Sequence, residues 1–170
     1  AGALAPGGGI GLMVYAPLGR TGVYPMQAAL RTVTAGLPPE RIQPMVADFL
    51  AHYEAHIADE TCLFPGARAA LDRFRDAGFR LAICTNKPER LARLLIDRLA
   101  VADRFDAICG RGSFPVHKPD PQMLHLTVAM AGGDPARMIM VGDSRNDIEA
   151  ARAAGVPVLA LPYGYNHGEP

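Results

Sequence analysis

The chain has 170 residues, of which 49 % are hydrophobic and 20 % charged, a composition typical of one soluble globular domain with room for a small appendage. Seventeen basic residues balance seventeen acidic ones, and a net charge of zero argues against a nucleic-acid or membrane-surface binder, because both need a basic excess. The three cysteines include no C-x-x-C pair, which favours a reducing, cytoplasmic compartment and argues against a zinc site.

The first 25 residues are predicted to form an irregular segment. Residues 1–19 carry no charged side chain and contain six glycines and two prolines. They have neither the basic start of a signal peptide nor the run of about 20 apolar residues that a membrane span needs. The run from Gly7 to Gly11 is not assigned to phosphate binding, because no predicted strand precedes it and no Gly-Lys-Ser/Thr follows.

Residues 26–60 are predicted to be helical and to form a small, partial cap. Apolar residues at helical spacing cover 26–34, and Pro38-Pro39-Glu40 starts a second helix. Apolar residues recur along this second helix at steps of three and four: Ile42, Met45, Val46, Phe49, Leu50 and Tyr53. We expect this stripe to pack against the rest of the domain or to lie over a site as a lid. His52 and His56 could hold a metal ion, but no third ligand is apparent and a solvated surface is the favoured interpretation.

From residue 61 to residue 170, short apolar runs alternate with helical patterns. The predicted strands are 80–84, 105–109, 138–141 and 156–161, and the predicted helices are 67–77, 89–99, 121–131 and 146–154. Short continuous apolar runs separated by helices are typical of parallel strands that are covered on both faces. The predicted fold class is therefore α/β, with a doubly wound parallel sheet.

Polar motifs follow three of these strands, two of them directly and the one after 105–109 at the end of a loop. They are Thr85-Asn86-Lys87-Pro88, His117-Lys118-Pro119-Asp120-Pro121 and Gly142-Asp143-Ser144-Arg145-Asn146-Asp147. Ligands of doubly wound sheets bind at the carboxyl ends of the strands, so we expect the motifs to converge. A hydroxyl can hold phosphate oxygens, an ammonium can neutralise developing charge, and carboxylates can hold a hard cation such as Mg²⁺. Together the motifs predict a phosphoryl-transfer site.

Each motif also has a purely structural interpretation. Asp143 or Ser144 could cap the following helix, Asp147 could complement its dipole, and Thr85 with Asn86 could form another cap. The lysines favour the functional interpretation, because the chain has fifteen arginines but only two lysines, and each lysine precedes a proline in one of the motifs.

In order and separation, the three motifs resemble motifs two, three and four of the haloacid dehalogenase superfamily. Residues 63–170 are similar to the bacterial phosphoglycolate phosphatases in the entry Leu63-Phe-Pro-Gly66, in Thr-Asn-Lys-Pro, and in the closing run from Gly164 to Glu169. The helices before residue 60 resemble the small cap of these enzymes only loosely.

The resemblance implies a role for each matched residue. Thr85 and Asn86 would bind the substrate phosphate, and Lys118 would steady the nucleophile and the transferring phosphoryl group. Asp143 would ligate Mg²⁺, and Asp147 would support the metal or orient Lys118. The implied activity of the full-length parent is Mg²⁺-dependent hydrolysis of a small phosphorylated organic acid, above all 2-phosphoglycolate, through an aspartyl-phosphate. The implied protein is a cytoplasmic monomer or homodimer that binds a small phosphorylated metabolite and neither nucleic acid nor membrane.

The chain departs from the family at the first motif, an Asp-x-Asp-Gly-Thr run after an N-terminal strand. Its first aspartate is Asp48, inside the predicted cap helix, so no residue can be named as the nucleophile or the acid/base. We therefore expect a fragment that lacks the first strand and the C-terminal end, is marginally stable or prone to associate, and shows little turnover.

Three other functions stay open to different degrees. A sugar-phosphate phosphatase or phosphomutase of the same superfamily would share the three motifs. A catalytically inactive binding or regulatory remnant would account for the missing nucleophile. A receiver-type signalling module is disfavoured, because its acidic pair should come first in the chain and its lysine last.

Overall fold

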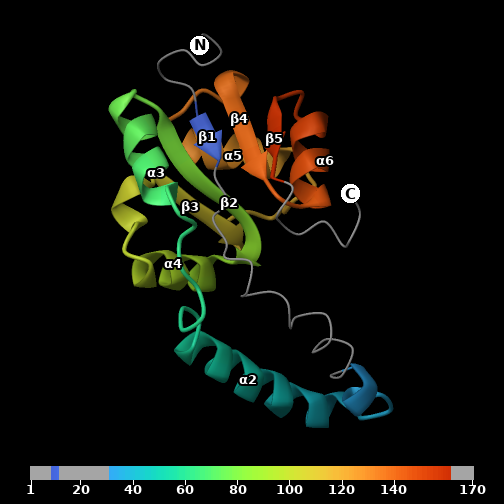
Figure 1. Ribbon diagram of the computed structural model, residues 1–170. Helices are drawn as coiled ribbons and strands as arrows, with labels where there is room; N and C mark the ends of the chain where they lie inside the picture. Colours follow the sequence, from blue (N-terminus) through green and yellow to red (C-terminus); the bar gives the residue numbers. More distant parts are fainter. Residues whose placement is uncertain (1–8, 12–30, 162–170) are drawn as a thin grey trace.

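The computed structural model describes residues 9–11 and 31–161, which build a five-stranded parallel sheet with helices on both faces (Figure 1). The strand order is β3-β2-β1-β4-β5. The strands are β1 Gly9–Gly11, β2 Arg80–Pro88, β3 Ala107–Arg111, β4 Met138–Gly142 and β5 Val158–Ala160. The helices are α2 Pro39–Ala55, α3 Ala67–Asp76, α4 Glu89–Arg98, α5 Gln122–Met130 and α6 Arg145–Ala153, with 3₁₀ turns η2 Ala102–Arg104 and η3 Pro135–Arg137. The predicted α/β class with a doubly wound parallel sheet is confirmed.

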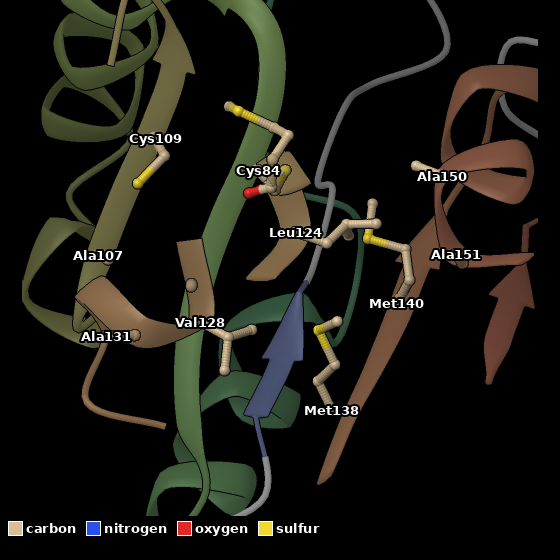
Figure 2. Close-up of a cluster of buried hydrophobic side chains, with 12 residues drawn as sticks. Cys84, Ala107, Cys109, Leu124, Val128, Ala131, Met138, Met140, Ala150 and Ala151 are labelled. Atoms are coloured by element: carbon tan, nitrogen blue, oxygen red, sulfur yellow. Dashed lines mark hydrogen bonds between the residues drawn. The ribbon is translucent and has the colours of Figure 1, made fainter. Parts of the chain in front are cut away.

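Successive residues of β2 pack into opposite layers of the core. Ala82 and Cys84 belong to a cluster with buried residues of β3, β4, α5 and α6, which Figure 2 shows. Leu81 packs with Leu71 of α3, and Ile83 packs with Ala92 of α4. This alternation buries both faces of the strand, and it explains why the strand appears in the sequence as an unbroken apolar run.

The centre of the sheet is occupied by the three residues of β1. Gly9 pairs with Arg80 of β2 and Met138 of β4, and Gly11 pairs with Ala82 and Met140. The expected irregular segment over residues 1–25 is therefore wrong for these three residues, and so is the expectation that the sheet lacks its first strand. The other residues of that segment lie outside the described residues. A strand can form here because inner sheet positions are filled by backbone hydrogen bonds, which glycine can make as well as any other residue.

Strand β2 extends four residues beyond its predicted end, so Thr85-Asn86-Lys87-Pro88 belongs to the strand itself. Gly110 of β3 makes this path possible. A Cβ atom at Gly110 would lie 2.5 Å from the Lys87 carbonyl oxygen and 2.6 Å from Glu89 Cα, both of them backbone atoms. The absence of a side chain at Gly110 therefore allows the polar end of β2 to approach the neighbouring strand closely.

Helix α2 extends away from the sheet (Figure 1) and approaches the core only at its C-terminal end. The apolar stripe expected to be covered is partly exposed: Val46, Phe49 and Leu50 are 49 %, 41 % and 43 % exposed against the described part of the chain. The expectation that the domain core covers this stripe is wrong for the described residues, because the helix points outward from its one attachment. The predicted helix over 26–34 lies mostly outside the described residues. Its described part, residues 31–34, is helical.

Two polar contacts attach the C-terminal end of α2 to the residues around the start of α4. Arg90 Nη2 donates to Glu54 Oε2 over 2.6 Å, and Arg90 Nη1 donates to Glu54 Oε1. Lys87 Nζ donates to the Tyr53 hydroxyl and lies 4.8 Å from the centre of the Tyr53 ring. The attachment therefore links α2 directly to the polar end of β2.

Replacing Arg90 by glutamine should increase hydrogen exchange of the α2 amides at neutral pH. The hydrogen bond from Arg90 lowers the pKa of Glu54 below its ordinary value of 4.5, so the stabilisation is present at neutral pH and is lost as the pH falls through the lowered pKa. The difference between wild type and variant should consequently disappear in acid. Arg98→Gln is the control, because Arg98 is an exposed arginine of α4, the helix that also contains Arg90. Equal exchange of wild type and Arg90→Gln at neutral pH would show that the pair does not hold α2.

No helix in the described ranges has the length and apolarity required to cross a bilayer.

Candidate functional site

The buried ammonium of Lys118 joins the ends of two strands. Lys118 lies in the segment between β3 and α5 and is 2 % exposed. Its Nζ donates to the Cys84 carbonyl oxygen of β2 over 2.6 Å and to Asp147 Oδ1 of α6 over 2.5 Å. Helix α6 follows directly after β4, and β1 lies between β2 and β4. An ammonium that contacts both sides therefore lies at the carboxyl end of β1, where doubly wound sheets bind ligands.

The carboxylate of Asp147 is completely buried and accepts hydrogen bonds at both oxygens. Oδ1 accepts from Lys118, while Oδ2 accepts from the backbone N–H of Asp143 and Ser144 and from Ser144 Oγ, at 3.2, 3.0 and 2.7 Å. The contacts with Ser144 form a capping box at the start of α6. The Ser144-x-x-Asp147 spacing is the sequence signal for this arrangement. These contacts favour the role of orienting Lys118 over that of a metal ligand.

Gly142 makes room for Asp147. A Cβ atom at Gly142 would lie 2.4, 2.5 and 2.7 Å from Asp147 Cβ, Cγ and Oδ2. Real Cβ contacts are essentially never this short. The last residue of β4 is therefore glycine for a steric reason that concerns the site directly.

Thr85 places a hydroxyl one residue beyond the carbonyl that binds Lys118. Thr85 is 3 % exposed and directly follows Cys84, whose carbonyl oxygen accepts a hydrogen bond from Lys118 Nζ. Thr85 Oγ1 accepts the Lys87 N–H over 3.2 Å. Within residues 9–11 and 31–161 the Thr85 O–H has no hydrogen-bond acceptor, so it is available to donate to an oxygen of a ligand.

Asn86 uses both polar atoms of its amide on the backbone of Lys118. Asn86 Nδ2 donates to the Lys118 carbonyl oxygen over 2.8 Å, and the Lys118 N–H donates to Asn86 Oδ1 over 3.0 Å. Nothing in the sequence indicated this partner, because the two residues are 32 positions apart.

The donor set at the strand ends fits Mg²⁺ with one carboxylate, that of Asp143. Mg²⁺ is commonly held by one or two carboxylates together with waters and phosphate oxygens. Across the described ranges, no three His, Cys, Asp or Glu side chains cluster as a preformed metal site. His52 lies near the end of α2 and His56 directly follows the helix; both are exposed, their ring centres are 4.3 Å apart, and His56 Nδ1 is bonded to Asp59 Oδ2. They take no part in this site.

Cys84 and Cys109 are buried neighbours in the register of β2 and β3. Burial raises the pKa of the Cys84 thiol above its ordinary value of 9.0, and the nearby Lys118 ammonium opposes the shift. A neutral thiol does not compete with Asp147 for Lys118.

Comparison with known proteins gives consistent matches. The family model for haloacid dehalogenase-like hydrolases matches residues 18–155. The chain is 47 % identical over 117 residues to a phosphoglycolate phosphatase of Mesorhizobium japonicum, covering 69 % of this chain and 52 % of that protein. It is 43 % identical over 129 residues to the phosphoglycolate phosphatase of Agrobacterium fabrum, covering 76 % and 55 %. The chain thus spans about half the length of the curated relatives it matches.

Solved structures agree with these matches. The crystal structure of a predicted phosphoglycolate phosphatase from Haemophilus somnus superposes with a TM-score of 0.78 at 28 % identity, covering 85 % of this chain and 64 % of that one. CbbY from Rhodobacter sphaeroides, solved in complex with phosphate, superposes with a TM-score of 0.61 at 27 % identity, covering 79 % and 61 %.

Proposed function

The chain belongs to the haloacid dehalogenase-like hydrolase family, and we propose that it supplies the phosphate-binding part of a hydrolase of small phosphorylated organic acids. The observation that carries this proposal is the buried Lys118 ammonium, held by Cys84 and Asp147 at the carboxyl end of β1. A cation in this place attracts an anion, and the adjacent Thr85 hydroxyl can donate to one of its oxygens.

Each strand-end residue has a task in binding a phosphomonoester. The Thr85 O–H donates to a phosphate oxygen, and the Lys118 ammonium balances the negative charge that grows on the phosphoryl oxygens. Asp147 holds this ammonium in place through its hydrogen bond. Asp143 would hold Mg²⁺, which would supply further charge neutralisation at the phosphate when bound.

The names of the curated relatives support the proposed substrate class. At 43–47 % identity they are named phosphoglycolate phosphatases, which favours 2-phosphoglycolate. A sugar phosphate is the alternative within the same superfamily.

Hydrolysis through an aspartyl-phosphate requires a carboxylate at the end of the first strand, and residues 1–39 contain neither Asp nor Glu. We therefore expect this chain to bind the substrate phosphate with little or no turnover. This expectation is shared by the third candidate, an inactive binding remnant. In a whole protein that has the carboxylate, Asp143→Asn should abolish Mg²⁺-dependent hydrolysis.

Calorimetric titration with 2-phosphoglycolate and Mg²⁺ tests the proposal. Thr85→Val removes the hydroxyl at nearly constant shape and should weaken binding about tenfold, the factor that corresponds to about 1.4 kcal/mol. Thr61→Val is the matched control. Asp143→Asn should remove only the gain in affinity that Mg²⁺ brings. Absence of binding at millimolar ligand would refute the proposed site, and steady phosphate release would show that another carboxylate attacks the substrate.

A further inference from the structure

The side chain of Asn86 imitates a backbone peptide unit. Its amide offers one acceptor and one donor to the N–H and C=O of a single residue, Lys118, at 3.0 and 2.8 Å. An amide and a peptide unit have the same donor and acceptor groups, so the pair resembles one additional rung of a β ladder. The segment that carries Lys118 is thereby fastened to the end of β2.

The same strand also holds the other end of Lys118. The Cys84 carbonyl oxygen accepts from Lys118 Nζ, and Cys84 precedes Asn86 by two positions. Strand β2 therefore binds both the backbone and the ammonium of Lys118. Thr85 lies between the two β2 residues that make these contacts, Cys84 and Asn86. The distance between the Thr85 hydroxyl and the ammonium depends on both attachments.

We propose that Asn86 is a positioning residue, which sets the Lys118 ammonium relative to Thr85. Both polar atoms of its amide are already engaged by Lys118. Nδ2 carries a second N–H besides the one donated to the Lys118 carbonyl, so a bond from Asn86 to a phosphate oxygen would be compatible with this arrangement. The proposal rests on the phosphate site proposed above, and it adds a positioning role to the role in phosphate binding that the family resemblance implies for this side chain.

The composition of the chain makes a direct test possible. Lys87 and Lys118 are the two lysines of the sequence, so labelling with ¹⁵N-lysine yields at most two Nζ signals. Lys87→Arg assigns them. A buried, hydrogen-bonded ammonium exchanges slowly enough to be observed at neutral pH, whereas a solvated ammonium broadens.

Asn86→Ala should shift or broaden the Lys118 Nζ signal before any ligand is added, and it should weaken binding of inorganic phosphate about tenfold. Asn86→Asp keeps the acceptor for the Lys118 N–H and places an oxygen against the Lys118 carbonyl. This second variant should therefore disturb the Lys118 signal as well, and it serves if the alanine variant does not fold. Gln122→Ala removes an amide from an exposed position and should change neither measurement.

Two outcomes would overturn the proposal. An unchanged Lys118 signal in the unliganded variants, together with weaker phosphate binding, would assign Asn86 to the phosphate itself. A changed signal with unaltered phosphate affinity would show that the contact with Asn86 affects the Lys118 ammonium but contributes nothing to phosphate binding. If wild type binds no phosphate, the proposed function fails, while the unliganded Lys118 signal still decides whether Asn86 positions this residue.

Discussion

Replacing Asp147 by asparagine should lower the free energy of unfolding by about 3–5 kcal/mol, the usual cost of removing one partner from a buried ion pair. Lys118 and Asp147 are 2 % and 0 % exposed, so water cannot replace the lost charge. The isosteric amide has no orientation that suits the site, because one carboxylate oxygen accepts from Lys118 and the other accepts from Asp143 and Ser144. Its NH₂ group meets a donor in either position. Urea denaturation measures the loss.

A double-mutant cycle separates the buried pair from the helix cap. Lys118→Met removes the ammonium. Asp147→Asn should therefore lower the free energy of unfolding by less in the Lys118→Met background than in wild type. Asp134→Asn is the matched control, because Asp134 is exposed and caps η3 through one hydrogen bond to the Ala136 N–H. It should cost about 1 kcal/mol or less. Equal costs for Asp147→Asn with and without Lys118 would show that the pair contributes nothing to stability.

Replacing Gly142 by alanine should both destabilise the fold and weaken phosphate binding. The new methyl group would overlap Asp147 at 2.4–2.7 Å, and overpacking of this kind typically costs about 1–3 kcal/mol. The Asp147 side chain must move to relieve this overlap. Its movement takes the carboxylate away from the Lys118 ammonium. We therefore expect an affinity for inorganic phosphate at least tenfold lower, a loss of about 1.4 kcal/mol, measured by titration of the folded variant.

Gly155→Ala provides the comparison for this variant. Gly155 has a φ of +69°, and a Cβ atom there would have no neighbour within 4 Å, so alanine adds backbone strain without overlap. This variant should lose stability, yet bind phosphate as wild type does. A Gly142→Ala protein with unaltered phosphate affinity would show that Asp147 is not needed to place Lys118.

The sheet could be predicted from the sequence except at its centre. Strands β2, β3 and β4 are buried on both faces, so each leaves a short apolar run in the sequence. Strand β1 leaves no such run, because two of its three residues are glycine. Glycine is depleted in strands, and only the open positions beside β2 and β4 make one form here.

The site could be predicted as a set of residues, but its internal contacts could not. Thr85, Lys118 and Asp147 are predicted to converge because each belongs to a polar motif that follows a predicted strand. The bond between Asn86 and Lys118 joins residues 32 positions apart and depends on how the segment after β3 returns to β2. The outward course of α2 likewise depends on its attachment through Tyr53 and Glu54, which no periodicity records.

The sequence by itself determined the fold class and the family to which these motifs point, and it predicted the strand ends at which the site is proposed. It did so because hydrophobic periodicity and motif spacing are local properties of the chain. The tertiary structure alone decided that Gly9–Gly11 forms the central strand of the sheet, that Asp147 accepts a hydrogen bond from Lys118, and that Asn86 binds the Lys118 backbone. These features arise where backbone and buried polar groups must find partners that distant segments supply, and burial makes an unsatisfied group too costly to leave.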